Sequence, residues 1–218
     1  MPELRPATRA VLFDLGGVLL TIDWERAFAT WAPHSRLPLE RIRERFSFDE
    51  PFRRHETGHL PDEGYFAHLR QLLELECEPG QVRAGFDAIL AGEIDETVRM
   101  LEAIRGRVPC YAISNTNPSH LARMGSGFPG FLDRFARVFA SHDIGHRKPH
   151  PESFEHVLRA IGLPAREVLL FDDLEPNIEA AAALGLQAVL VKSPADVRQA
   201  LVERGLLSER APAAAPRS

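Results

Sequence analysis

The sequence predicts an α/β fold: a Rossmann-like parallel sheet with helices on both faces, plus an inserted all-helical domain. Two observations predict the sheet. Short apolar runs recur along the chain, and a segment with helical periodicity follows each of the later runs. Apolar strands that alternate with helices are typical of parallel sheets buried on both faces. A third observation predicts the insertion, because residues 21–93 hold several amphipathic stretches and no convincing strand.

The predicted sheet has five strands, each a short apolar run. Most of the helix-like segments that follow carry Pro at or near the first turn, where a missing N–H costs nothing. The alternation of strand and helix indicates parallel strands joined by crossover helices. Strands are expected at Ala10–Asp14, Pro109–Ser114, Arg137–Ser141, Val168–Asp172 and Ala188–Lys192, and helices at Asp95–Arg105, Pro118–Met124, Pro151–Ile161, Pro176–Leu184 and Pro194–Arg204.

The insertion divides the chain into a core and a helical domain. We expect residues 1–20 and 94–207 to form the core, residues 21–93 the helical domain, and residues 208–218 a flexible tail. The tail is rich in Pro and Ala, so it cannot bury enough surface to offset its ordering entropy. Helices of the insertion are expected at Asp23–Trp31, Leu39–Phe46, Asp62–Leu75 and Gln81–Leu90.

Composition excludes several classes of protein. The 218 residues include 26 basic and 31 acidic side chains, and this net charge of −5, without a Lys/Arg-rich run, argues against a nucleic-acid partner. The longest apolar run, Ala10–Leu20, is interrupted by Asp14 and is shorter than the roughly 20 residues of a membrane span, so no membrane partner is expected. Cys77 and Cys110 predict no disulfide framework, which favours the cytoplasm. The oligomeric state stays open between monomer and homodimer.

Polar side chains stand at the ends of three predicted strands. Asp14 ends the first strand, Ser114-Asn115 end the second, and Asp172-Asp173 end the fourth. In an open parallel sheet the ligand site lies beyond the carboxyl ends of the strands, so we expect these side chains to converge.

This set of side chains suits phosphoryl transfer. Paired carboxylates suit a hard cation such as Mg²⁺, which takes one or two carboxylates together with a phosphate oxygen. Lys148, in the loop before a predicted helix, supplies further positive charge near the same edge. Asp14 can then attack phosphorus as a covalent nucleophile. The expected partner is a small phosphorylated molecule.

Four short motifs occur in order across nearly the whole folded chain. They are Phe13-Asp14-Leu15-Gly16-Gly17-Val18, then Ser114 after an apolar strand, then Lys148 before Pro149, then Phe171-Asp172-Asp173 with Asn177. This order resembles the haloacid dehalogenase (HAD) superfamily, and the helical insertion is similar to that family's C1 cap. The segments Ile22–Trp24 and His55–Gly58 further resemble small bacterial phosphatases of the alpha-D-glucose-1-phosphate phosphatase type.

The resemblance implies Mg²⁺-dependent hydrolysis of small phosphomonoesters, sugar phosphates foremost, through an aspartyl phosphate on Asp14. It also implies a role for each matching residue. The catalytic residues are Asp14, Ser114 and Lys148; the metal ligands are Asp14, the Gly16 carbonyl, Asp172 and Asp173; and the substrate is bound by Gly16, Gly17, Ser114, Asn115 and Lys148, with His55 and Glu56 as exposed polar residues of the cap.

One position departs from the family pattern. Most family phosphatases have a second aspartate two residues after the nucleophile, which protonates the leaving group, whereas this chain has Gly16. Such proton transfer is typically worth about 10² to 10⁴ in rate, so good leaving groups such as sugar 1-phosphates suffer least. A cap residue or a metal-bound water is an alternative proton source. Two other functions stay open: a 2-haloacid dehalogenase-type hydrolase, and a degenerate HAD-like binding or regulatory protein.

Trp24, Phe28 and Trp31 fall on one face of the first helix of the insertion. An aromatic stripe at this spacing is typical of core packing between helices. We therefore expect these rings in the core of the cap rather than against a sugar.

Overall fold

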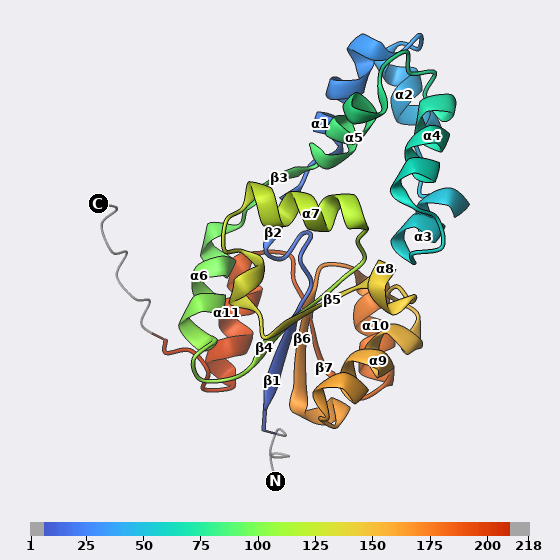
Figure 1. Ribbon diagram of the computed structural model, residues 1–218. Coiled ribbons are helices and arrows are strands. Elements are labelled where there is room, and N and C mark those ends of the chain that lie inside the picture. The colour runs from blue at the N-terminus through green and yellow to red at the C-terminus, as the bar shows by residue number, and fades with distance from the viewer. Residues whose placement is uncertain (1–6, 210–218) are drawn as a thin grey trace.

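The computed structural model describes residues 7–209, in which five strands form one sheet in the order β5-β4-β1-β6-β7 (Figure 1). All neighbouring strands of this sheet run parallel, so the predicted fold class is confirmed. Most of the predicted tail, residues 210–218, lies outside the described residues. The strands are β1 (Ala10–Phe13), β4 (Cys110–Ser114), β5 (Arg137–Ala140), β6 (Val168–Asp172) and β7 (Gln187–Leu190).

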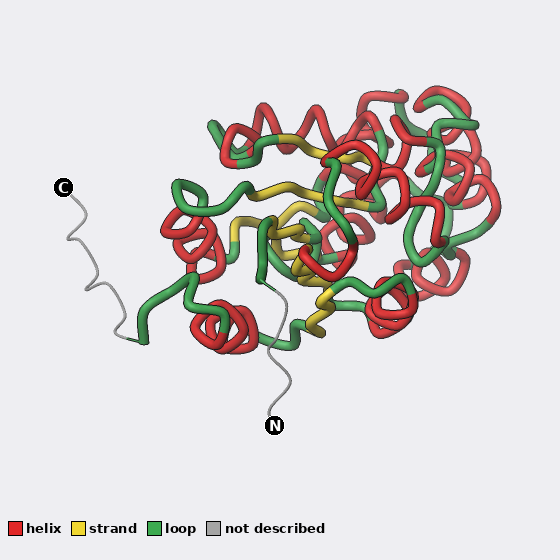
Figure 2. Tube along the Cα trace, turned by 90° about the horizontal axis from the view of Figure 1, so that it is seen from below, coloured by secondary structure: helices red, strands yellow, loops and turns green. Residues whose placement is uncertain are grey.

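Alternate residues of the central strand β1 serve the two faces of the sheet. Val11 and Phe13 belong to one buried cluster, and Ala10 and Leu12 belong to the other. The first cluster includes residues of α6 and α11, and the second includes residues of α9 and α10, which lie on the other side of the sheet (Figures 1 and 2). The core helices are α6 (Asp95–Ile104), α7 (Pro118–Gly127), α8 (Ser141–Ile144), α9 (Pro151–Ile161), α10 (Glu175–Ala183) and α11 (Pro194–Glu203), with short 3-10 turns at Leu132–Arg134 and Ala165–Glu167.

The inserted segment gathers its helices beyond the carboxyl ends of the sheet strands (Figure 1). Two short strands, β2 and β3, pair antiparallel where the chain leaves and re-enters the core. The expectation that residues 21–93 hold no strand is wrong at both ends. Strands this short do not establish a periodic pattern of apolar and polar residues, and they pair residues about seventy positions apart in the sequence. The elements are β2 (Leu20–Ile22), α1 (Trp24–Trp31), a 3-10 turn at Ala32–His34, α2 (Leu39–Arg45), α3 (Glu50–Glu56), α4 (Asp62–Leu72), α5 (Pro79–Asp87) and β3 (Leu90–Glu93).

A close contact between α1 and α5 holds the inserted helices together. The Trp31 indole Nε1 donates a hydrogen bond to the Val82 carbonyl at 2.9 Å, and the ring is fully buried. A Cβ at Gly85 would lie 2.1 Å from Trp31 Nε1, so only glycine fits at this point of α5. Phe28 and Trp31 thus have the core role predicted for them. No helix in the described range is long and apolar enough to cross a membrane.

Candidate active site

Lys148 joins two of the predicted acidic residues at the carboxyl end of the sheet. Its Nζ lies 3.0 Å from Asp14 Oδ1 and 2.6 Å from Asp172 Oδ2, and it also donates to the Ile113 carbonyl at 3.1 Å. All three charged side chains are buried. Burial alone would lower the pKa of Lys148, but the charges of Asp14 and Asp172 outweigh it and raise that pKa. The lysine therefore stays cationic.

The loop that carries Lys148 is held by the side chain of Asn115. Asn115 Nδ2 donates to the Lys148 carbonyl, and Asn115 Oδ1 accepts from the Lys148 N–H, both at 2.8 Å. Asn115 follows β4, so this pair of hydrogen bonds fixes the lysine against the sheet edge. The predicted substrate-binding residue Asn115 thus uses its amide to position Lys148.

Asp14, Asp172 and Asp173 form a group suited to a divalent cation. One carboxylate oxygen from each of the three lies within 4.8 Å of those of the other two. Asp172 is oriented by Asn177 Nδ2 and by the Leu174 N–H, which donate to Oδ1 at 2.8 Å and 3.0 Å. Burial, and then the charge of Asp172, raises the pKa of Asp173. Three acidic groups and one lysine leave the site with excess negative charge. Mg²⁺, which prefers oxygen ligands, would balance that charge.

The nucleophile predicted from the sequence carries a perturbed carboxyl group. Burial raises the pKa of Asp14 to about 7, opposed by the charge of Lys148. The Leu15 N–H donates to Asp14 Oδ1 at 2.7 Å, and Lys148 approaches the same oxygen. The Leu15 N–H and Lys148 Nζ both contact Oδ1. Oδ2 is therefore the oxygen available for a nucleophilic reaction.

Gly17 rather than Gly16 has the backbone that glycine favours. Its φ is +73°, and a Cβ there would lie 2.1 Å from Asp173 Oδ2. Gly17 thus leaves room for the third acidic group. A Cβ at Gly16 would meet only the Ile22 side chain, with Cγ1 at 3.1 Å and Cδ1 at 3.5 Å, and φ at Gly16 is not in the left-handed range.

These residues open into one cavity of about 450 Å³ between the sheet edge and the inserted helices. Asp172 lies beneath the cavity, fully buried, and is not part of its lining. The predicted residues that line it are Asp14, Gly16, Gly17, Glu56, Ser114, Asn115, Lys148 and Asp173.

The family model of the haloacid dehalogenase-like hydrolases matches residues 8–185 of the chain. The chain belongs to the haloacid dehalogenase-like hydrolases. A phosphatase of Mycobacterium tuberculosis, MT3486, is 28% identical over 202 residues, which cover 88% of this chain and 91% of the relative. The D-ribitol-5-phosphate phosphatase of Bacteroides thetaiotaomicron is 27% identical over 202 residues, 88% of this chain and 95% of the relative.

A solved structure gives the same classification. The HAD family enzyme bt-2542 of Bacteroides thetaiotaomicron, in complex with magnesium and inorganic phosphate, has a TM-score of 0.77 and 25% identity, covering 85% of this chain and 95% of that chain. Together with the phosphatase relatives, this makes the chain a HAD-like phosphatase of phosphorylated small molecules.

In this HAD-like hydrolase, His55 does not face the cavity. Its side chain is fully buried, Nε2 lies 2.8 Å from Asp62 Oδ1, and its ring stacks on Tyr65 at 4.4 Å. The expectation that His55 and Glu56 are exposed is wrong for both, because α3 turns them into the packed face of the insertion. Glu56 alone of the two lines the cavity.

The sequence did not predict a functional role for several residues that line the cavity. Arg147 Nε lies 2.9 Å from Glu56 Oε2, which links the Lys148 loop to α3. His120 Nε2 donates to the Phe86 carbonyl at 3.0 Å, and burial lowers the pKa of His120 to about 4, so the ring is neutral. The only hint was proximity, since Arg147 directly precedes Lys148. Phe48, Phe52, Thr116 and Leu174 also line the cavity.

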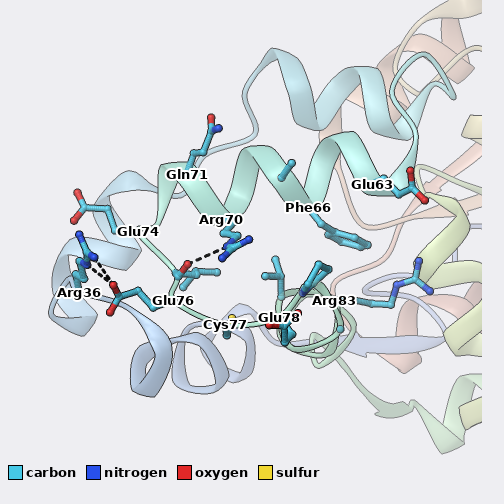
Figure 3. Close-up of a pocket in the computed structure, with 15 residues that line it drawn as sticks. Arg36, Glu63, Phe66, Arg70, Gln71, Glu74, Glu76, Cys77, Glu78 and Arg83 are labelled. Carbon is cyan, nitrogen blue, oxygen red and sulfur yellow. Dashed lines mark hydrogen bonds and ion pairs between the residues drawn. The ribbon is translucent and has the colours of Figure 1, made fainter.

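A larger hollow, of about 1080 Å³, lies on the inserted helices away from the sheet edge (Figure 3). None of the four motifs contributes a residue to its lining. Its charged groups are partly paired with one another, as Arg36 and Glu76 show in Figure 3. The four motifs therefore mark the smaller cavity at the strand ends as the candidate active site.

Proposed function

We propose that the chain is a Mg²⁺-dependent phosphatase that hydrolyses small phosphomonoesters through an aspartyl phosphate on Asp14. The observation that carries the proposal is the buried ion pair of Asp14 and Lys148, 3.0 Å apart, beside the oxygens of Asp172 and Asp173. The three carboxylates argue against the 2-haloacid dehalogenase alternative, since that reaction needs no cation. The intact charged set argues against a degenerate binding protein.

The metal would be held by Asp14, Asp172, Asp173 and the Gly16 carbonyl, as the sequence predicts. Bound Mg²⁺ would supply positive charge that stabilises the phosphoryl oxygens. A nearby cation also favours the ionised form of Asp14, whose pKa burial raises to about 7. The nucleophile is then in its reactive, charged state at neutral pH.

The reaction has two displacements at phosphorus. Asp14 Oδ2 forms a bond to phosphorus as the bond from phosphorus to the ester oxygen breaks, and the alcohol leaves with one proton. Water then attacks the phosphorus of the aspartyl phosphate and gives a proton back to the group that protonated the alcohol, which releases inorganic phosphate and restores the carboxylate of Asp14. Lys148 and the Ser114 hydroxyl neutralise and orient the phosphoryl oxygens.

Glu56 supplies the proton that an aspartate at position 16 would otherwise deliver. Its side chain is buried in the cavity lining, and Oε2 has no well-aligned hydrogen bond although Arg147 Nε lies 2.9 Å away. Burial raises the pKa of Glu56 to about 7, opposed by Arg147, which suits a general acid at neutral pH. His120 is no substitute, because its Nε2 hydrogen is already donated to Phe86.

The Glu56→Gln variant is expected to lose about 10² to 10³ in kcat/KM on alkyl phosphates and much less on p-nitrophenyl phosphate, whose leaving group needs no proton. In the wild type, only the protonated form donates, so kcat on alkyl phosphates should fall as pH rises through about 7. That fall should be absent in Glu56→Gln. Glu63→Gln, an exposed change on α4, is the control. Equal losses on both classes of substrate would remove Glu56 from this role.

Phosphate release from a panel of phosphomonoesters, with Mg²⁺ and then with EDTA, tests the proposed function. We expect release that depends on the metal. Release that EDTA does not reduce would exclude the metal, and chloride release from 2-chloropropionate without phosphatase activity would favour the dehalogenase alternative. No release from any ester, p-nitrophenyl phosphate included, would favour a binding or regulatory protein.

The sequence-based expectations on compartment and substrate belong to the same proposal. Cys77 and Cys110 are both buried free thiols, which supports a reducing compartment such as the cytoplasm. The preference for sugar phosphates and the choice between monomer and homodimer stay predictions. The relative from Bacteroides thetaiotaomicron is named for a sugar-alcohol phosphate, but the lining of this cavity favours a different leaving group.

A further inference from the structure

We infer that the cavity takes phosphomonoesters whose leaving group is an apolar hydrocarbon alcohol, in preference to hydroxyl-rich sugar phosphates. The inference rests on the proposed phosphatase function and names its substrate class. It stands on three features of the cavity: where apolar surface is exposed, how the wall is built, and which polar groups are already engaged.

The large hydrophobic side chains that the described residues leave exposed are Phe48, at 55%, and Leu174, at 52%. Both line the same cavity as Asp14. Phe48 precedes α3 of the insertion, and Leu174 precedes α10 of the core, so the two come from separate parts of the chain. Exposed apolar surface gathered at one site marks a surface that binds an apolar group.

Behind Phe48 the wall of the cavity is aromatic. The Phe48 ring lies 5.0 Å from Phe52 and 5.6 Å from Trp24, and Trp24 lies 6.3 Å from Phe52. All three rings line the cavity, together with Ile22 at the foot of the insertion. Trp24 therefore differs from the sequence-based expectation: it packs on the core of the insertion and also forms the wall of the pocket.

Three polar residues of the lining are already hydrogen-bonded within the protein. Asn115 binds the backbone of Lys148, Asn177 binds Asp172, and His120 binds Phe86. A sugar brings several hydroxyl groups, and burying a hydroxyl without a hydrogen-bond partner is unfavourable. Outside the phosphate site, the lining residues with a buried side-chain atom that lacks a hydrogen bond are Glu56, Thr116 and Arg147. Polar side chains with unpaired buried atoms are therefore few beside the apolar wall, which disfavours a hydroxyl-rich group, and Glu56 remains to protonate one leaving oxygen.

A series of straight-chain phosphates tests the inference. Ethyl, butyl, hexyl and octyl phosphate have nearly the same leaving-group basicity, so chain length changes only the contacts with the wall. Below micelle-forming concentrations, kcat/KM should rise by up to about fourfold per methylene until the cavity is filled. Octyl phosphate should then exceed glucose 1-phosphate, glucose 6-phosphate and ribitol 5-phosphate.

Two variants assign the effect to the exposed residues. Phe48→Ser and Leu174→Ser each remove an exposed side chain, so neither should unfold the protein, and each should reduce the gain per methylene to less than twofold. The matched control is Leu163→Ser, a partly buried leucine in the loop before β6, at the opposite edge of the sheet. It should keep the wild-type dependence on chain length.

A flat series, or sugar phosphates faster than octyl phosphate, would overturn the inference while leaving the phosphatase function intact. A steep series that persists in both Phe48→Ser and Leu174→Ser would also overturn it. If no ester is hydrolysed, including p-nitrophenyl phosphate, the proposed function itself fails.

Discussion

The Asp14→Asn variant is expected to release phosphate with a kcat/KM more than about 10⁴-fold below that of the wild type, on every substrate. An amide is a poor nucleophile and forms no acyl phosphate. The change keeps the shape of the side chain and removes a charge whose burial is unfavourable, as the raised pKa of about 7 indicates. In EDTA the variant should therefore unfold at a Tm equal to or above that of the wild type.

Steady-state release of phosphate and thermal unfolding together check this result. Asp133→Asn changes an aspartate far from the cavity, on the 3-10 turn Leu132–Arg134, and should leave activity unchanged. A folded Asp14→Asn protein with activity near that of the wild type would refute the assignment of the nucleophile.

The Lys148→Met variant should lose both activity and stability. Without the ammonium group, the buried carboxylates of Asp14 and Asp172 face each other uncompensated, and removing one partner of such a pair costs about 3–5 kcal/mol of unfolding free energy. Turnover should fall by at least about 10³-fold, because charge that stabilises the phosphoryl group is lost. Phosphate release and denaturant unfolding measure the two effects.

The chain provides a matched control in Lys192, its one other lysine, which is exposed after β7. Lys192→Met should change neither quantity. The double variant Asp14→Asn with Lys148→Met should recover part of the lost stability, because one of the unpaired charges is gone. If Lys148→Met were as stable as the wild type, the buried ion pair would not have the energetic role described here.

The sheet was predictable because its signals are local. Each strand is a continuous apolar run, and a residue that ends such a run is placed at the sheet edge by the topology alone. Asp14, Ser114 and Asp172 follow this rule. Helices α1, α2, α4 and α5 were predicted from their periodicity within a few residues, although α5 ends at Asp87 and Leu90 already belongs to β3.

The parts that were not predicted depend on contacts between distant segments. Pairing of Leu20 with Glu93 creates β2 and β3, and neither strand has a pattern of its own. Helix α3 was not among the predicted helices, so the directions of His55 and Glu56 were unknown. The link between Glu56 and Arg147 joins residues about ninety positions apart. The exposure of Phe48 depends on how the aromatic residues of the insertion pack, with Trp24, Phe46 and Phe52 around it, which no local pattern encodes.

The stereochemical course at phosphorus tests the central claim most directly. A phosphomonoester made chiral at phosphorus with oxygen isotopes is hydrolysed in water that carries the remaining isotope, and the configuration of the released phosphate is determined. Two in-line displacements, first by Asp14 and then by water, each invert phosphorus, so the account predicts net retention. Net inversion would show that water attacks the ester directly and would contradict an aspartyl phosphate on Asp14.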